Sequence, residues 1–314
     1  MNSSSIQNGS SYVRYPDSFS TAIAKNITVV LLGISINYLN GTLIHTFRKH
    51  QVFYHNPRYI LFIHLVVNDM IQLTTAITLF VCAYVFYTIN TFLCCIILSF
   101  AVCTTLNSPL NLAVMAVECY IAVCFPLQHP QMCNIKKIYK VIGCMWALSI
   151  LSFLPDIFFL AVTEPAKFFS VVLCEATHLI ENPIMKKKRE VTFAMYLVGV
   201  WLVLIYSYIQ IFLAARSAKT TNSDAKKARN TILLHSFQLL LCMSTYVYPS
   251  VQQLVLILFK RTYLHFLFVW YILLQILPRF LSPIVYGLRD NMFRKHLKKY
   301  LSCSATHKVS AHRR

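Results

Sequence analysis

Long apolar stretches recur along the chain and constrain its fold more than any other feature. A helix needs about 20 consecutive, mostly apolar residues to cross the hydrocarbon core of a bilayer. Stretches of this kind occur seven times, at about 26–47, 59–86, 92–124, 138–162, 191–215, 231–259 and 263–286. The connections are short, the longest at about 163–190, so we expect no second folded domain. The sequence predicts an all-α membrane protein, with a seven-transmembrane helix bundle at 26–289, an N-terminal tail at 1–25 and a C-terminal segment at 290–314.

The composition supports lipid as the solvent for much of this surface. Hydrophobic residues make up 57% of the 314 residues and charged residues only 12%, whereas a soluble domain carries about 25% charged residues. This balance excludes an ordinary water-soluble enzyme. A net charge of +19 would favour nucleic acid as the partner of a soluble protein. Here the basic residues lie in short runs between apolar stretches, so we interpret them as determinants of membrane orientation and expect no nucleic-acid partner.

The distribution of Lys and Arg predicts the orientation, because cytoplasmic loops carry an excess of both. With the N-terminus outside, nineteen basic residues fall on the cytoplasmic side and nine on the outer side, and Arg279 lies within the seventh stretch. We therefore expect an extracellular N-terminus and a multi-pass plasma-membrane protein. The tail lacks the zones of a cleavable signal, so the first stretch is expected to direct insertion. N-x-S/T motifs then predict glycosylation at Asn2, Asn8 and Asn26, the last of which is close to the membrane, while the match at Asn40 lies within a stretch and is discounted.

Eleven cysteines could indicate metal binding or a disulfide scaffold. Most lie within apolar stretches, where a thiol usually serves as a small apolar side chain, and no C-x-x-C pair occurs, so we expect no metal site. Cys174 is the only cysteine in the long outer loop, and Cys94 opens the third stretch. Because the outer side is oxidising, we predict a disulfide between Cys94 and Cys174, with Cys95 as the alternative partner.

The inner end of the third stretch carries the strongest local motif. The segment from Met115 to Leu127 reads M-A-V-E-C-Y-I-A-V-C-F-P-L and resembles the M-A-x-D/E-R-Y-x-A-x-C-x-P-L signature of odorant receptors, a branch of the rhodopsin-like G-protein-coupled receptors. Further matches follow in the family's order: Asn40, Asn56-Pro57-Arg58-Tyr59, Asn68-Asp69, Trp146, Lys227-Ala228-Arg229-Asn230-Thr231 with His235, and Ser282-Pro283-Ile284-Val285-Tyr286. The resemblance covers nearly the whole chain and has the character of fish-type odorant receptors. It implies a small-molecule odorant as ligand and a stimulatory heterotrimeric G protein, which raises cAMP, as partner.

Two positions depart from the family pattern. Cys119 replaces the Arg that follows the acidic residue, and Ser282 replaces the Asn before the proline of the last stretch. In the family, this Arg is held by its acidic neighbour, here Glu118, at rest and meets the G protein on activation. We therefore expect a resting state that lacks one ion pair, a raised basal activity and weak coupling. The resemblance places the G-protein surface at Glu118, Cys119, Tyr120, Tyr208, Lys227, Arg229 and Tyr286.

Asp69 lies in the middle of the second stretch. A carboxylate at membrane depth is costly and marks a functional site by default. The resemblance brings Asn40, Ser108 and Ser282 near Asp69, which implies a polar cluster that could hold a sodium ion or a proton and rearrange on activation. The alternative is a neutral, hydrogen-bonded Asp69 that only joins helices.

The resemblance also implies a ligand pocket between spans three, five, six and seven, near the outer face. No acidic residue occupies the outer half of the third stretch, so an amine held by a carboxylate there is not expected, although Asp156 in the fourth stretch could contact a cation. The candidate residues are mainly apolar with a few hydroxyls and one amide, as in many small-molecule sites, and each could instead serve helix packing. They are Val102, Thr105, Leu106, Thr192, Tyr196, Tyr246, Ser250 and Gln275.

Two other classes of membrane protein compete with a receptor. A transporter would more naturally show repeated halves with broken, Gly-rich helices, whereas the whole chain has 6 Gly. An intramembrane enzyme would need a catalytic constellation, and neither G-x-S-x-G nor H-E-x-x-H occurs. After the last stretch, Phe293, Leu297 and Leu301 alternate with basic residues, which predicts an amphipathic helix on the inner leaflet with Cys303 as a palmitoylation site.

Overall fold

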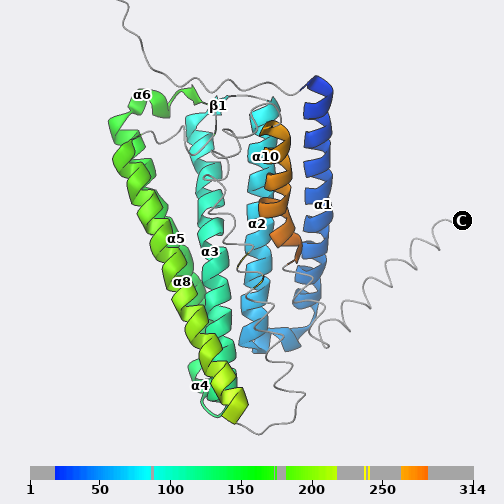
Figure 1. The fold of residues 1–314 in the computed structure, drawn as a ribbon, viewed down its shortest axis with the longest axis vertical. Helices are drawn as coiled ribbons and strands as arrows, with labels where there is room; N and C mark the ends of the chain where they lie inside the picture. The colour runs from blue at the N-terminus through cyan, green and yellow to red at the C-terminus, as the bar shows by residue number, and fades with distance from the viewer. Residues whose placement is uncertain are drawn as a thin grey trace, which may run out of the picture.

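The computed structural model describes residues 18–85, 88–172, 174, 182–217, 237, 240 and 263–281. Within these residues, five helices are long and apolar enough to cross a membrane, and they stand side by side in Figure 1. They match the first five predicted stretches. These helices are α1 (Phe19–Lys49), α2 (Pro57–Val85), α3 (Thr91–Cys124), α5 (Ile135–Thr163) and α8 (Pro183–Ser217).

The seventh predicted stretch is helical from Tyr263 to Leu281. It begins as α10 (Tyr263–Tyr271) and continues through one π-helical segment, η2 (Ile272–Ile276). Pro278 follows two residues after Ile276. A proline lacks the N–H that an α-helix needs, so a local change of helical register is expected near it. The sixth predicted stretch, about 231–259, lies outside the described residues apart from Phe237 and Leu240, and the predicted amphipathic helix at 290–314 lies outside them as well.

Short polar side chains determine where three of the long helices begin. Ser18 accepts a hydrogen bond from the backbone N–H of Thr21, so α1 starts before the apolar stretch predicted from about residue 26. Asn90 and Asn134 cap α3 and α5 in the same way, because a side-chain oxygen satisfies an N–H that lacks a partner within the helix. Capping by Ser18 therefore makes α1 longer than its predicted apolar stretch.

The connections between the helices are compact. The chain passes through η1 (Gln51–His55) between α1 and α2, α4 (His129–Met132) between α3 and α5, and α6 (Pro165–Phe168) after α5. β1 (Ile89–Asn90) and β2 (Val171–Val172) pair antiparallel, with Ile89 opposite Val172. Figure 1 shows β1 and α6 at one end of the bundle and α4 at the other. We call these the disulfide end, which holds Cys94 and the two strands, and the α4 end.

α3 is the most buried of the five long helices and packs against α2, α5 and α8 (Figure 1). Leu65, Leu112 and Leu204, from α2, α3 and α8, belong to one apolar cluster. A second cluster joins α1, α2 and the seventh helix through Ile36, Leu73 and Ile276. The outward faces carry large apolar side chains, as lipid-facing surfaces do; among them are Leu31, Leu151, Phe158 and Leu202.

Candidate functional site

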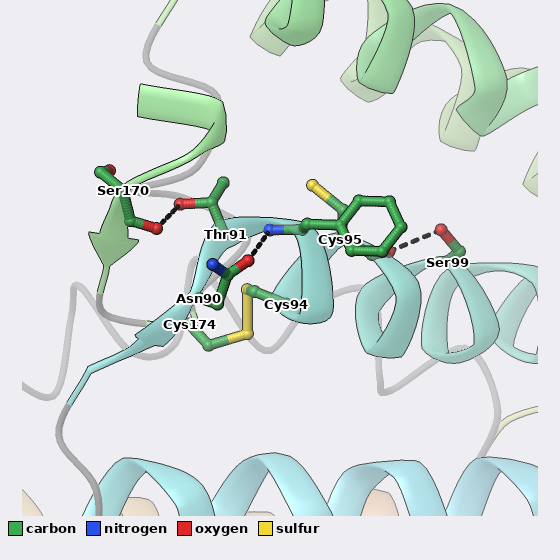
Figure 2. The surroundings of a disulfide bond; sticks show 8 residues. Asn90, Thr91, Cys94, Cys95, Ser99, Ser170 and Cys174 are labelled. Carbon is green, nitrogen blue, oxygen red and sulfur yellow. Dashed lines mark hydrogen bonds between the residues drawn. A yellow bond between two sulfur atoms is a disulfide. The ribbon is translucent and has the colours of Figure 1, made fainter. Parts of the chain in front are cut away.

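A disulfide fixes the loop after α6 to the start of α3. Cys94 and Cys174 are bonded, with their Cα atoms 5.6 Å apart. The prediction of this pairing is confirmed, and Cys95 is a free, buried thiol that Figure 2 shows pointing away from Cys174. Beside the bridge, the hydroxyl of Thr91 donates to the carbonyl of Ser170 at 3.0 Å (Figure 2). The backbone N–H of Thr91 donates to the same carbonyl, also at 3.0 Å. The loop is therefore held to α3 by covalent and hydrogen bonds.

The predicted pocket residues on α3 differ in their surroundings. Thr105 Oγ1 accepts a hydrogen bond from Gln72 of α2 at 2.9 Å and donates to the carbonyl of Ala101 at 2.7 Å. Leu106 is fully buried, whereas Val102 is half-buried and packs against the apolar cluster around Cys94. Thr105 and Leu106 thus contribute to helix packing in this structure, and a ligand role for either stays a prediction.

The pocket residues of the other spans are only partly described. Tyr196 of α8 lies 3.1 Å from the hydroxyl of Ser152 in α5, so its polar tip joins these two helices. Thr192 in α8 and Gln275 in η2 are half-buried. Tyr246 and Ser250 lie outside the described residues. The predicted ligand set stays a prediction.

The carboxylate of Asp156 pairs with Lys188 of the same chain. Its carboxylate is 2% exposed and accepts a hydrogen bond of 2.5 Å from Lys188 Nζ, which also donates to the carbonyl of Ser152 at 3.0 Å. The sequence reasoning considered a cation at Asp156 but did not name Lys188. The signal was present as the basic run from Lys186 to Arg189 that precedes the fifth stretch on the same side of the membrane.

Asp69 belongs to a buried polar network between α2 and α3. Ser108 Oγ lies within hydrogen-bonding distance of both Asp69 Oδ1, at 3.4 Å, and Gln72 Oε1, at 3.3 Å. Asn68 Nδ2 donates to Ser108 Oγ and to the carbonyl of Thr104, each at 2.9 Å. The structure brings Ser108 to Asp69, as expected. Asn68 and Gln72 were not predicted as site residues, although positions 68, 69 and 72 share one face of a helix.

The structure describes only one of the two remaining residues of the predicted switch, Asn40 and Ser282. Asn40 in α1 is fully buried, and neither atom of its amide has a hydrogen-bond partner among the described residues. Ser282 lies outside the described residues. Sodium or a proton at Asp69 therefore stays a prediction.

Glu118, at the α4 end, is held by two basic side chains. Its carboxylate is 4% exposed; Oε2 lies 3.2 Å from Arg58 Nε and Oε1 lies 3.0 Å from His129 Nε2. Arg58 stands in the first turn of α2, where Asn56 Oδ1 accepts its backbone N–H at 3.0 Å. His129 opens the short helix α4. Two segments that are distant in sequence thus converge on one buried carboxylate.

Glu118 has basic partners in this structure, although Cys119 stands where the family has its Arg. Cys119 cannot pair with it, but Arg58 and His129 can. The sequence could not reveal this, because Arg58 is 60 residues away from Glu118 and only helix packing brings the start of α2 to the end of α3. The charge of Glu118 also reaches Cys133, in the connection after α4, whose pKa is raised chiefly by burial and then by this carboxylate.

Two other predicted coupling residues, Tyr120 and Tyr208, pack against aromatic or apolar side chains. The ring of Tyr120 packs edge-on against Tyr206 of α8 and against Phe125. Tyr208 packs against the apolar cluster of α2, α3 and α8. Lys227, Arg229 and Tyr286 lie outside the described residues.

The predicted glycosylation site at Asn26 lies in the helix α1. Its amide nitrogen donates to the carbonyl of Ala22 at 2.8 Å. An acceptor asparagine is normally found in an exposed loop, so this geometry weighs against modification at Asn26, which stays an untested prediction. Asn2 and Asn8 lie outside the described residues.

Comparisons with known proteins identify the family of this chain. The family described as "7 transmembrane receptor (rhodopsin family)" matches residues 39–286. Odorant receptor 131-2 of the zebrafish, Danio rerio, is 32% identical over 284 residues, which cover 89% of this chain and 86% of the relative. The chain therefore belongs to the rhodopsin family of seven-transmembrane receptors and, within that family, to the odorant receptors.

Proposed function

We propose that this protein binds a small odorant between its helices and activates a stimulatory heterotrimeric G protein, which raises cAMP. The observation that carries the proposal is the similarity to Odorant receptor 131-2 along 89% of the chain. We place the receptor in the plasma membrane, with the disulfide end outside and the α4 end in the cytoplasm. The excess of Lys and Arg predicted for the cytoplasmic side supports this orientation, and so does the disulfide, which persists in an oxidising compartment.

The ligand site that we propose lies near the disulfide end, among Val102, Thr105, Thr192, Tyr196 and Gln275. Apolar surface with a few hydroxyl and amide groups suits a small, weakly polar molecule, because it replaces water around the ligand and leaves few polar groups to satisfy. The bond between Cys94 and Cys174 supports the proposal, since it fixes the loop beside this region before any ligand arrives. A fixed loop lowers the entropy cost of binding.

At the α4 end we propose that Glu118, Arg58 and His129 form a resting-state latch. We use this name for these three residues. The latch replaces the ion pair that other odorant receptors make with the Arg that is Cys119 here. It supports the proposal because it ties α2 and α4 to α3, beside the surface where a G protein would bind. Activation would then require Glu118 to give up these partners.

An odorant panel with a cAMP reporter tests the proposed function. The receptor is expressed in cells that supply an olfactory-type stimulatory G protein, and untransfected cells are the control. We expect a saturable, concentration-dependent rise in cAMP for at least one odorant in the receptor-expressing cells alone. Saturable uptake of a labelled solute, with no cAMP response to any odorant, would support the alternative of a small-solute transporter and contradict the proposal.

A further inference from the structure

Three oxygen atoms lie in a row where the side chains of α5 and α8 meet. Ser152 Oγ, in α5, lies 2.8 Å from the backbone carbonyl of Leu148, four residues earlier in the same helix. The hydroxyl of Tyr196, in α8, lies 3.1 Å from the same Ser152 Oγ. Two hydroxyl groups and one carbonyl group therefore share two short contacts.

This row holds only two protons, so the donor of each contact is determined. Oxygen atoms at these distances repel each other unless a proton lies between them, so each contact needs one proton. A carbonyl has no proton and a serine hydroxyl has one, so Ser152 donates to Leu148. The proton of the other contact must then come from Tyr196. The Tyr196 hydroxyl is therefore a donor to Ser152 and can only accept a hydrogen bond from a further group.

Tyr196 stands on the inward face of α8. Val200 and Leu204 follow it at intervals of four residues, which places all three on one face of the helix. Both are buried and belong to the apolar cluster that includes residues of α2 and α3. Met185, near the start of α8, packs against the cluster around Cys94, so α8 runs from the disulfide end. Tyr196 therefore lies one turn nearer to the proposed ligand site than Val200.

The charged groups beside this row are already paired. Asp156 lies one turn along α5 from Ser152, and its carboxylate pairs with Lys188 Nζ, which also donates to the carbonyl of Ser152. An ammonium ligand would have to displace Lys188 from Asp156, and a carboxylate ligand would compete with Asp156 for Lys188. Breaking a buried ion pair is costly, because it leaves one charge uncompensated. A neutral ligand avoids this cost.

We propose that Tyr196 selects neutral ligands that donate a hydrogen bond, that is, alcohols rather than ethers, esters or ketones. The hydroxyl of an alcohol can donate to a lone pair of the Tyr196 oxygen, whereas an ether or carbonyl oxygen would meet this oxygen with no proton between them. Ser152 is a positioning residue, because it takes up the proton that Tyr196 could otherwise donate. The inference rests on the proposed function, since it specifies the chemical class of the odorant at the proposed site.

Pairs of isomeric odorants test this selectivity at equal molecular size. The probes are the straight-chain alcohols from n-butanol to n-nonanol and benzyl alcohol, each compared with its isomeric methyl ether, which is anisole for benzyl alcohol. The full-length receptor is expressed with the stimulatory G protein, and the half-maximal concentration for cAMP is measured. We expect at least one alcohol to act at a concentration about tenfold lower than its isomeric ether, which corresponds to about 1.4 kcal/mol.

Two variants should change the preference in different ways. Tyr196→Phe removes the hydroxyl and keeps the ring, so the half-maximal concentration of the active alcohol should rise about tenfold while that of the ether stays unchanged. Ser152→Ala removes the acceptor of the Tyr196 proton, which becomes available to a ligand oxygen. The half-maximal concentration of the ether should therefore fall by about fivefold in Ser152→Ala. General damage to the fold would instead weaken the responses to alcohol and ether alike.

Ser35 and Tyr38, in α1, provide the matched controls. Ser35 Oγ donates to the backbone carbonyl four residues earlier at 2.8 Å, as Ser152 does. Tyr38 is exposed. Ser35→Ala and Tyr38→Phe should leave the ratio of the alcohol and ether concentrations unchanged at equal surface expression. A parent receptor that responds equally to alcohols and ethers, or a Tyr196→Phe variant that loses both responses equally, would overturn the inference.

The thermal midpoint in detergent gives a readout that does not require signalling. Each probe is added to the parent and to Tyr196→Phe, and the difference between the two proteins removes any general effect of the alcohol on the detergent-solubilised protein. An alcohol that stabilises the parent more than Tyr196→Phe, without raising cAMP, would support the inference and contradict the proposed signalling. Equal stabilisation of the two proteins, or no stabilisation by any alcohol, would overturn the inference.

Discussion

Arg58 Nε lies 3.2 Å from Glu118 Oε2, which joins the first turn of α2 to the last turns of α3. The contact is asymmetric, because the Glu118 side chain is 4% exposed whereas Arg58 is 47% exposed. Solvent therefore screens the cation, and the pair contributes about 1 kcal/mol or less, as partly exposed ion pairs do. His129 adds a second contact to the same carboxylate. A modest energy of this size suits a switch, because a ligand or a G protein can overcome it.

Loss of the latch should raise basal signalling. Arg58→Met removes the cation and keeps an apolar side chain of similar length, so the resting state loses up to about 1 kcal/mol. If the active state does not use this contact, the basal active fraction should rise by up to about fivefold. The measurement is ligand-free cAMP at equal surface expression. The matched control is Arg48→Met, which removes an exposed basic side chain from the last turn of α1. This variant should leave basal cAMP unchanged. Unchanged basal cAMP in Arg58→Met would show that the pair does not bias the resting state.

Restoring the family residue at position 119 should change both basal and ligand-evoked signals. In Cys119→Arg, the new guanidinium competes with Arg58 for Glu118 and also offers the G protein a cationic contact. We expect stronger evoked cAMP at equal surface expression, with a shift in basal cAMP, once an activating odorant is known. Cys119→Ser, which adds no charge, is the control. Superimposable signals from Cys119→Arg and the parent would make position 119 irrelevant to switching.

The disulfide should be essential for stable surface expression. Cys174→Ser breaks the bond with Cys94, which lies 80 residues earlier in the sequence. A disulfide contributes about 2–4 kcal/mol to the free energy of unfolding. We expect a lower thermal midpoint and reduced surface delivery. Cys95→Ser is the control, because Cys95 is a free thiol adjacent to the bonded one. A greater loss in Cys95→Ser than in Cys174→Ser would contradict the assigned bond.

Cys133 should react with alkylating agents only at high pH. Its pKa is raised by burial and then by the Glu118 carboxylate, while Lys137 lowers it. Because the thiolate is the reactive form, a raised pKa shifts the rise of the alkylation rate to higher pH. Peptide mass spectrometry after timed alkylation measures this curve. Glu118→Gln should move it to lower pH and Lys137→Gln to higher pH; shifts of the opposite sign would contradict the electrostatic cause.

The pattern of apolar residues was sufficient to predict the five long helices that the structure describes. Hydropathy over about 20 residues is a local property, so α1, α2, α3, α5 and α8 could be located without any knowledge of packing. The first and last residues of the helices were predicted less accurately. Ser18, for example, extends α1 through a hydrogen bond that hydropathy does not measure. The bond between Cys94 and Cys174 was predictable, because Cys174 is the only cysteine in the long loop expected on the oxidising side and few other cysteines are expected on that side. The motif around Glu118 was sufficient to identify the family.

Only the tertiary structure decided which charges meet. Arg58 and His129 reach Glu118, and Lys188 reaches Asp156, because of how helices rotate and how deeply they sit against one another. Each of these contacts depends on distances of a few ångströms between different helices, and Arg58 and Lys188 lie 60 and 32 residues from their partners. A rotation of one helix by a single residue, about 100°, would separate them without changing the hydropathy of any stretch. The sequence alone therefore located the five long apolar helices of the described residues, and packing determined which basic side chains neutralise Glu118 and Asp156.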